Sequence, residues 1–410
     1  MRRLIPLTIG SFALGLDAFV VAGILPIMSA NLHLSVSAIG QLVTVFTLSY
    51  ALLSPVFSTL LTGRSLRAVL LMALLVFTAG NVLTATSSAF PALLAARAVA
   101  GIGAGLYSPM SVAAAAGLVP AERRGRALAM ITGGMSSGVV LGVPIGLALA
   151  QAAGWRATIW LVVGLTVIAF IGIAAFLPDL RSAASAPSLR ARAGVLADRR
   201  VLTITLVTLT CATASIGSYT YLSALLGHAL HATNLTLYLW VWGLGGLVGS
   251  FAVGQVIDRW ADTRALVSVI AGVLGGALLL LPLADHHVAT VLPVLFIWGI
   301  AGWSSLAPQQ HRMLAVREKD GTVAVTLNSS ATYLGSSVGA GIGGLLLGAG
   351  LSADVLPLLY GGVAALCALL NLATPAARPK RPGRAEGAAA RSDPATAVSD
   401  PATLRGSRPR

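Results

Sequence analysis

Charged residues are scarce in this chain, and acidic residues are the scarcest. Only 10% of the 410 residues are charged, 13 of them Asp or Glu, whereas 56% are hydrophobic. A soluble domain carries about a quarter charged residues, so the composition excludes an ordinary soluble protein. It predicts an all-α polytopic membrane protein, because apolar segments of about 20 residues cross a bilayer as helices.

Cysteines and recognisable catalytic motifs are also lacking. The two cysteines, Cys211 and Cys367, lie inside apolar stretches, which excludes a disulfide framework and offers no metal-ligand spacing. The chain has no Gly-x-x-x-x-Gly-Lys-Ser/Thr loop for ATP and no His-Glu-x-x-His zinc motif. We therefore expect no cofactor, no metal ion and no enzymatic activity.

The net charge of +14 does not indicate nucleic-acid binding, because of where the cations lie. All Lys and Arg residues except Arg97 and Arg156 fall at the two ends or in alternate connections between apolar stretches. This positive-inside pattern predicts an even number of spans and both termini in the cytoplasm. Arg heavily outnumbers Lys, and Ala and Gly are abundant, which is typical of a GC-rich bacterial genome. We expect a bacterial inner-membrane protein.

Twelve apolar stretches are long enough to span a bilayer. We predict an N-terminal six-helix bundle over 1–177, a cytoplasmic linker over 178–200 and a C-terminal six-helix bundle over 201–374. Residues 375–410 are rich in Pro, Ala, Gly, Ser and Arg, which predicts a disordered cytoplasmic tail. The expected spans are 4–28, 37–61, 68–87, 91–118, 125–151, 155–177, 201–226, 235–257, 264–283, 288–310, 321–348 and 353–374.

The two predicted bundles repeat each other weakly. Glycines recur at four-residue spacing in the fifth stretch and, six helices later, in the eleventh. Small residues at this spacing let helices approach closely. Two parallel six-helix repeats around a central cavity are the plan of a secondary transporter. The glycines are Gly134, Gly138, Gly142, Gly146, Gly335, Gly339 and Gly343.

Asp17 lies near the middle of the first apolar stretch. An ionised carboxylate there costs about 2.5–3.5 kcal/mol on insertion scales, so it needs a partner, a water-filled cavity or a proton. Arg97 lies at a compatible depth in the fourth stretch, so a direct or water-mediated pair is expected. We predict that Asp17 is a reversible proton carrier facing a central cavity and that Arg97 is its partner. The alternatives are a structural acid and an arginine that reaches the outer interface.

Two segments are candidate gates. In Gly138-Val-Val-Leu-Gly142-Val-Pro144-Ile-Gly146, the proline removes a backbone hydrogen bond and bends the helix. The alternative for this stretch is ordinary tight packing. At the end of the eighth stretch, an acid beside arginines would latch the cytoplasmic side against the other bundle, with a solvated loop as the alternative. These latch residues are Asp258, Arg259 and Arg264.

Polar and aromatic residues inside spans are candidate substrate-binding residues around the central cavity. Each of them also fits a place in the protein core or between helices. The candidates are Gln41, Tyr50, Tyr107, Tyr219, Tyr221, Trp303, Asn328 and Tyr333.

Several of these motifs resemble those of a known family. Phe19-Val-Val-Ala-Gly23-Ile-Leu-Pro26 resembles the helix 1 signature of that family. Arg97 with Gly101 resembles its helix 4 motif. The stretch from Gly138 to Gly146 resembles the helix 5 motif of its exporters. Over residues 3–374 the chain resembles the twelve-helix drug:proton antiporters of the major facilitator superfamily. It is most similar to the group of chloramphenicol-resistance and arabinose-efflux-type permeases.

Two departures from the family's pattern concern the gates. In the loop after the second stretch, Gly63 and Leu66 take the places of the family's Asp and Gly. In the helix 5 motif, the usual Gly-Pro pair is split into Gly142-Val143-Pro144. The latch is therefore expected on the side of the eighth stretch.

The resemblance implies the major facilitator fold and a proton-coupled secondary active exporter that works by alternating access. Its expected partners are a small-molecule substrate, protons and the lipid bilayer, without nucleic acid, and the chain is expected to be a monomer. Lipophilic neutral or cationic drugs, amphenicols and sugars all fit the predicted cavity. The alternatives are a proton-coupled importer of a sugar or metabolite on the same fold, and a non-transporting membrane protein.

Overall fold

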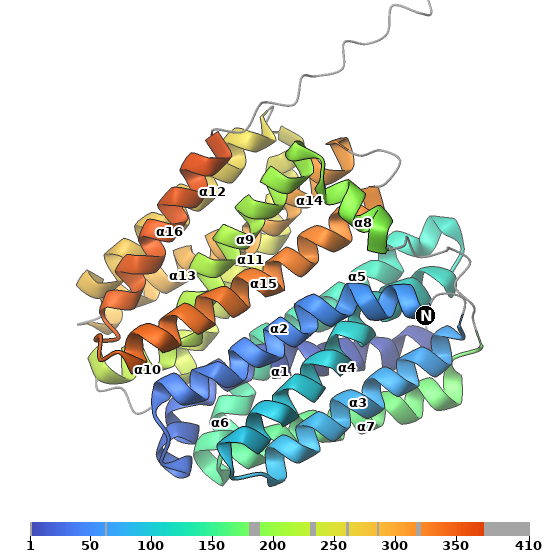
Figure 1. Ribbon diagram of the computed structural model, residues 1–410, viewed down its shortest axis with the longest axis horizontal. Coiled ribbons are helices and arrows are strands. Elements are labelled where there is room, and N and C mark those ends of the chain that lie inside the picture. Colours follow the sequence, from blue (N-terminus) through green and yellow to red (C-terminus); the bar gives the residue numbers. More distant parts are fainter. Residues whose placement is uncertain are drawn as a thin grey trace, which may run out of the picture. The chain divides into compact units, whose positions relative to one another are not determined.

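The computed structural model describes residues 2–61, 64–179, 189–229, 235–259, 262–284, 287–316 and 321–372. These residues form helices joined by short connections, without β-strands (Figure 1). The predicted tail over 375–410 lies outside the described residues, as do Gly63 and residues 180–188 of the predicted linker.

The first six spans form the N-terminal half. The fifth of them is one continuous segment in which a π-helical turn, η3, separates two α-helices, and a short 3-10 helix, η1 (Arg2–Leu4), precedes the first. The helices are α1 (Ile5–Leu32), α2 (Val36–Leu60), α3 (Leu66–Thr86), α4 (Phe90–Gly117), α5 (Arg124–Ser137), η3 (Gly138–Gly142), α6 (Val143–Ala153) and α7 (Trp155–Phe176).

The last six spans form the C-terminal half. Two of them are broken, at Tyr221 and at Ser305, and a short helix, α8 (Leu189–Leu196), lies in the predicted linker. The helices are α9 (Arg199–Thr220), α10 (Leu222–Ala229), α11 (Thr236–Arg259), α12 (Thr263–Ala284), α13 (Val288–Ser304), α14 (Leu306–Val316), α15 (Gly321–Gly348) and α16 (Val355–Leu372).

The prediction of twelve spans in two six-helix bundles is confirmed. Eleven of the described segments are long and apolar enough to cross a membrane. The twelfth span is α15, which has 28 residues but carries Asn328 and several Ser, Thr and Gly residues that lower its hydropathy. The first span is longer than expected, because α1 continues to Leu32 and ends at His33, in a left-handed conformation.

Short polar caps and one glycine turn set the helix ends. The Ser35 hydroxyl accepts a hydrogen bond from the Ala38 amide at 3.1 Å, and Ser65 caps α3 through the Ala68 amide at 3.2 Å. Such caps satisfy amide groups that have no partner within the helix. Between α6 and α7, Gly154 has a φ of 85°, a conformation that favours glycine.

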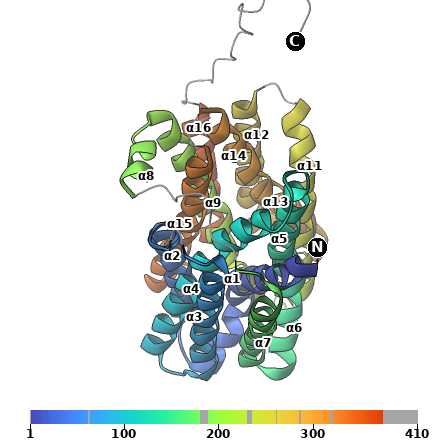
Figure 2. The same cartoon turned by 90° about the vertical axis from the view of Figure 1, so that its right-hand side faces the viewer.

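The two halves meet mainly where α2 packs along α15, and Figures 1 and 2 both show these helices side by side. In addition, α10 contacts α1, and α11 contacts η3 and α6. We call the end of the bundle at which α1, α3, α5 and α9 begin the basic side, because Arg3, Arg67, Arg124 and Arg199 lie there.

Within each half, helices approach closely at glycines. A Cβ atom added at Gly245 of α11 would overlap the carbonyl oxygen of Phe296 on α13. On the same helix, a Cβ atom at Gly254 would meet no atom within 4 Å. These two glycines separate the effect of close packing from the effect of helix propensity.

We predict that Gly245→Ala lowers thermal stability, because overpacking costs about 1–3 kcal/mol. Gly254→Ala should keep or raise it, because alanine favours a helix by about 1 kcal/mol over glycine. Thermal unfolding of the purified protein in detergent measures both. Equal melting temperatures for the two variants would contradict the packing described between α11 and α13.

Candidate functional site

A buried ion pair joins α1 to α4. The Nη1 atom of Arg97 lies 2.9 Å from Oδ1 and 3.1 Å from Oδ2 of Asp17, and Nη2 lies 3.5 Å from the Asp17 carbonyl oxygen. The side chains are 1% and 0% exposed. The direct pair expected from the similar depths of the two residues is therefore present.

The neighbours of this pair come from α2 and α3. The Arg97 guanidinium carbon lies 4.3 Å from the centre of the Phe46 ring. Asn81 interacts with the Asp17 carboxylate, and its amide nitrogen donates to the Phe77 carbonyl at 3.1 Å. The Asn81 Oδ1 atom and the Arg97 Nε atom are both buried without a hydrogen-bond partner. The site thus holds one unused acceptor and one unused donor beside the pair.

The Asp17 carboxylate faces the interior of the N-terminal half, which corrects the expectation that it faces a central cavity. Phe19, two residues later, lines the cavity described below. Two residues correspond to about 200° around an α-helix, so the two side chains point to opposite sides of α1. The ion pair and the cavity are therefore connected through the body of α1.

A central cavity of about 400 Å³ lies between the two halves. Its described lining contains aromatic residues, hydroxyl groups and the Gln310 amide, and no charged side chain. Such a surface suits an uncharged molecule, because nothing in it would balance the charge of a buried ion. The polar residues of the lining include Ser108, Thr132, Ser136, Thr208, Ser215, Ser250, Ser305, Gln310, Ser329 and Thr332.

Aromatic rings from both halves form the walls of this cavity or pack directly behind them. Phe19 of the N-terminal half packs on Trp303, with ring centres 5.9 Å apart, and on Tyr219, at 5.7 Å. On the other side, Tyr50 stacks on Tyr333 at 3.7 Å. Both clusters contain rings from each half. A displacement of either half therefore changes the packing of the cavity wall.

The structure brings three of the eight predicted substrate-binding residues to the cavity: Tyr50, Trp303 and Tyr333. Tyr219 lies behind the lining and stacks on Trp242 at 4.1 Å. The sequence reasoning did not single out Trp242, which lines the cavity. A tryptophan in the middle of a glycine-rich apolar stretch was the available signal.

The other four candidates lie elsewhere and contact neighbouring helices. The Tyr107 hydroxyl donates to the Leu7 carbonyl at 2.9 Å, and the Tyr221 hydroxyl to the Ala340 carbonyl at 2.6 Å. Asn328 accepts a hydrogen bond from Thr208 at 2.6 Å. Gln41 lies against α15, where it would meet a Cβ atom added at Gly344.

Contacts between the halves close the cavity at the end away from the basic side. The Ser37 hydroxyl donates to the Gly344 carbonyl at 2.5 Å, and Ser337 donates to the Thr44 carbonyl at 3.0 Å. A third bond runs from Ser223 to the Ala22 carbonyl at 2.6 Å. The cavity itself lies between this closed end and the basic side.

The glycines of the predicted helix 5 gate pack α5, η3 and α6 against α1. Cβ atoms added at Gly138 and Gly142 would meet Phe12 and Leu16, and one at Gly146 would meet Val20. At the predicted bend the structure has the π-helical turn η3, which ends at Gly142, two residues before Pro144.

The predicted latch residues do not join the two halves through any contact described here. Asp258 and Arg259 are exposed at the end of α11. The Arg264 Nε atom donates to the Asn371 carbonyl at 3.1 Å, a contact between α12 and α16 within the C-terminal half.

Comparison with known proteins identifies the family. Residues 7–316 match the Major Facilitator Superfamily. The chain is 29% identical over 377 residues to the inner membrane transport protein YdhP of Escherichia coli (strain K12), covering 90% of this chain and 94% of that protein. It is 29% identical over 349 residues to a chloramphenicol resistance protein of Streptomyces lividans, covering 83% and 88%.

A solved structure shows the same fold. The crystal structure of a D-xylose-proton symporter superposes with a TM-score of 0.72 at 18% identity, covering 90% of this chain and 96% of that one. The chain is thus a multi-pass membrane transporter of small molecules, not an enzyme, and it belongs to the Major Facilitator Superfamily.

Proposed function

We propose that this protein is a proton-coupled exporter of small, uncharged aromatic compounds in the bacterial inner membrane, with both termini in the cytoplasm. The observation that carries the proposal is the buried Asp17–Arg97 pair, 0% and 1% exposed. Ionisable residues inside a membrane span are rare and mark ion or proton pathways. Resemblance to a chloramphenicol resistance protein favours export, and the positive-inside pattern supports a cytoplasmic location of the basic side.

Protonation of Asp17 would change the packing around it. A neutral carboxyl group no longer balances the Arg97 charge, and an unbalanced buried charge is strongly unfavourable. The free Oδ1 atom of Asn81 then offers Arg97 a new acceptor. Moving the guanidinium from Asp17 toward Asn81 shifts α4 and α3 relative to α1. We propose this exchange of partners as the step that couples the proton to the conformation.

The body of α1 would carry this change to the substrate. Asp17 lies on one face of α1, and Phe19 lies on the opposite face, at the cavity wall. Its glycine-mediated contacts with α5 and η3 make those segments move with it. The closed end at Ser37 and Gly344 corresponds to an inward-facing state, and the outward-facing state requires these contacts to open.

The chemistry of the cavity supports an uncharged, flat substrate with a few hydrogen-bonding groups. Its walls offer ring faces for stacking and hydroxyl groups for orientation, whereas no described lining residue is charged. Compounds resembling chloramphenicol fit this description. The driving force is the proton gradient, since one charge crossing 100 mV is worth about 2.3 kcal/mol.

We predict that Asp17→Asn abolishes uphill efflux and also destabilises the protein by about 3–5 kcal/mol, because it leaves Arg97 buried without a counter-charge. The double variant Asp17→Asn/Arg97→Gln should recover stability but not uphill efflux. Chloramphenicol transport in proteoliposomes under an imposed pH gradient measures coupling, and thermal unfolding measures stability. Glu122→Gln, an exposed acid on the basic side, is the control. Uphill efflux by either Asp17 variant would refute the proposed proton carrier.

We predict that Asn81→Ala slows coupled efflux at least tenfold while the protein stays folded, because Arg97 loses its second acceptor. Thr84→Ala on the same helix is the matched control, since the Thr84 hydroxyl only bonds the Gly80 carbonyl of its own helix, at 2.9 Å. Proton release on substrate binding, recorded with a pH indicator in detergent, distinguishes coupling from folding. Equal proton release and transport in the two variants would exclude a role for Asn81.

We predict that Trp303→Ala raises the concentration for half-maximal transport of an aromatic substrate about tenfold or more, because ring stacking contributes about 0.5–1.5 kcal/mol beyond the buried area of the side chain. The control is Trp160→Ala, which removes a tryptophan that is 46% exposed on α7. A drug-sensitivity panel in an efflux-deficient bacterial host gives a second readout and the direction of transport. Reduced uptake of a nutrient, without drug tolerance, would indicate an importer instead.

A further inference from the structure

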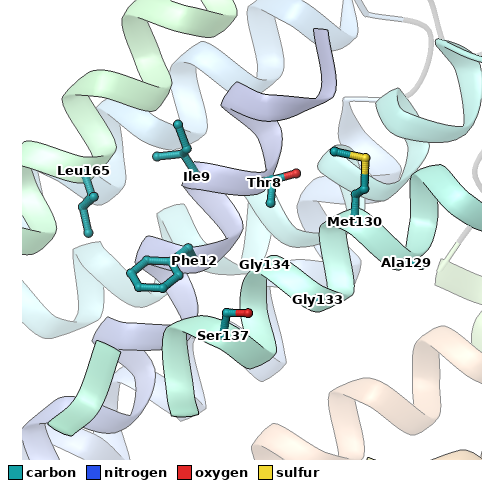
Figure 3. Close-up of a pocket in the computed structure, with 9 residues that line it drawn as sticks. All are labelled: Thr8, Ile9, Phe12, Ala129, Met130, Gly133, Gly134, Ser137 and Leu165. Carbon is teal, nitrogen blue, oxygen red and sulfur yellow. The ribbon is translucent and has the colours of Figure 1, made fainter. Parts of the chain in front are cut away.

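A second pocket lies apart from the central cavity, between the first turns of α1, the later turns of α5 and the middle of α7. It has a volume of about 440 Å³. Figure 3 shows its lining, with Leu165 of α7 and Met130 of α5 at opposite ends and Phe12 of α1 between them. Of its hydroxyl groups, that of Thr8 already donates to the Leu4 carbonyl of its own helix at 3.1 Å. The surface of the pocket is therefore mostly apolar.

The pocket is separate from the central cavity, although α5 borders both. Thr132, Met135 and Ser136 line the cavity, whereas Gly133 and Ser137 line the pocket. Between them the backbone of α1 touches that of α5 and of η3. A Cβ atom at Gly134 would lie 2.7 Å from the Thr8 carbonyl oxygen, and one at Gly138 would overlap the Phe12 carbonyl. This seam leaves no passage for a substrate from the pocket to the cavity.

The pocket opens toward the bilayer. Gly133 is exposed, and a Cβ atom added there would meet nothing within 4 Å. On α7, the residues that follow Leu165 include Ile168 and Ile171, which are 55% and 60% exposed. Large exposed apolar side chains on a membrane-spanning helix contact lipid. An acyl chain is therefore the molecule that this surface meets.

The depth of the pocket matches one leaflet. Its lining on α5 runs from Ala129 to Ser137. These two residues lie 5 and 13 positions after Arg124, the first residue of α5. At 1.5 Å per residue, the pocket extends from about 8 to about 20 Å below the first residue of α5. Half of a hydrocarbon core of about 30 Å is about 15 Å. The pocket thus covers most of the length of one acyl chain.

Exposed arginines lie on the basic side of the pocket lining. Arg126 lies 4, 7 and 11 residues before Met130, Gly133 and Ser137, so helical periodicity places it on the same face of α5 as the pocket. Arg3 lies on η1, which contacts α5. Arg3, Arg123, Arg124 and Arg126 are all exposed.

Within the described part of the chain these arginines form no ion pair, since the salt bridge found there joins Asp17 to Arg97. Glu122, also exposed, is the acid next to them in the sequence. Basic clusters at the membrane surface attract anionic headgroups, at about 1 kcal/mol per cation.

We propose that this pocket binds one anionic phospholipid from the leaflet on the basic side. One acyl chain lies along α5 between Phe12, Met130 and Leu165, and the phosphate lies at Arg126 with Arg3 and Arg123. The lipid bridges α1, α5 and α7 at the end opposite to the closed contacts between the halves. This site does not depend on what the protein transports.

The test compares thermal unfolding of the full chain in detergent with added dioleoylphosphatidylglycerol, dioleoylphosphatidylcholine or inorganic phosphate. The phosphatidylglycerol should raise the melting temperature by about 5 °C, as expected for a ligand well above its dissociation constant. The zwitterionic lipid and inorganic phosphate should each give less than half of this shift. Equal shifts with the two lipids, or a full shift with inorganic phosphate, would overturn the proposal.

Two kinds of variant locate the site. Gly133→Leu fills the pocket from a position with free space, and Arg123→Gln/Arg126→Gln removes the charges at its mouth. Each should lose at least half of the phosphatidylglycerol shift. The matched controls are Gly272→Leu, at an exposed glycine of α12 with nothing within 4 Å, and Arg200→Gln, at an exposed arginine on the basic side.

The controls should keep the full shift. If the controls lose as much of it as the pocket variants, the lipid acts through overall charge or surface area and the assigned site is wrong. If Gly133→Leu does not give a monodisperse protein, the arginine variant decides alone, because its side chains are exposed and their removal leaves the core intact.

Discussion

The carboxylate of Asp17 and the guanidinium of Arg97 meet inside the N-terminal half, where neither is accessible to solvent. Each charge is tolerated there only because of the other. The requirement fixes the distance between α1 and α4 and places Phe46 and Asn81 around the pair. The packing of four helices thus depends on a charge balance that a single proton changes.

The cavity and the ion pair lie on opposite faces of the same helix, α1. On one side α1 contributes Phe19 to a ring cluster with Trp303 and Tyr219, and on the other it contributes Asp17. Glycines of α5, η3 and α6 hold α1 from a third direction. A single helix thus links the ion pair to the cavity wall, without a chain of intermediate side chains between them.

Much of the architecture follows from the sequence. Hydropathy and the distribution of arginines predicted the twelve spans, and the depths of Asp17 and Arg97 along their spans predicted the pair. The direction in which Asp17 faces did not follow, because the composition of α1 is apolar all around and leaves its rotation about its own axis undetermined. Its rotation is set by tertiary contacts, such as the approach of Gly15 to the Met135 backbone.

The residues of the cavity were harder to predict, for a different physical reason. A tyrosine in a span satisfies its hydroxyl group equally well on a substrate or on a backbone carbonyl of the next helix. Tyr107 and Tyr221 bond carbonyls, whereas Tyr50 and Tyr333 stack at the cavity. The choice depends on which carbonyls a neighbouring helix leaves within reach, and this is a property of the packed bundle rather than of any one stretch.

The polar character of α15 bears on how the protein assembles during synthesis. Asn328 bonds Thr208 of α9, and Ser337 bonds the Thr44 carbonyl of α2. Both partner helices leave the ribosome well before α15 does. A span with buried amide and hydroxyl groups is held poorly by lipid alone, whereas partner helices satisfy these groups. The polar groups of the eleventh span thus find their partners on one helix of each half, so that this span is satisfied only once both halves are packed against it.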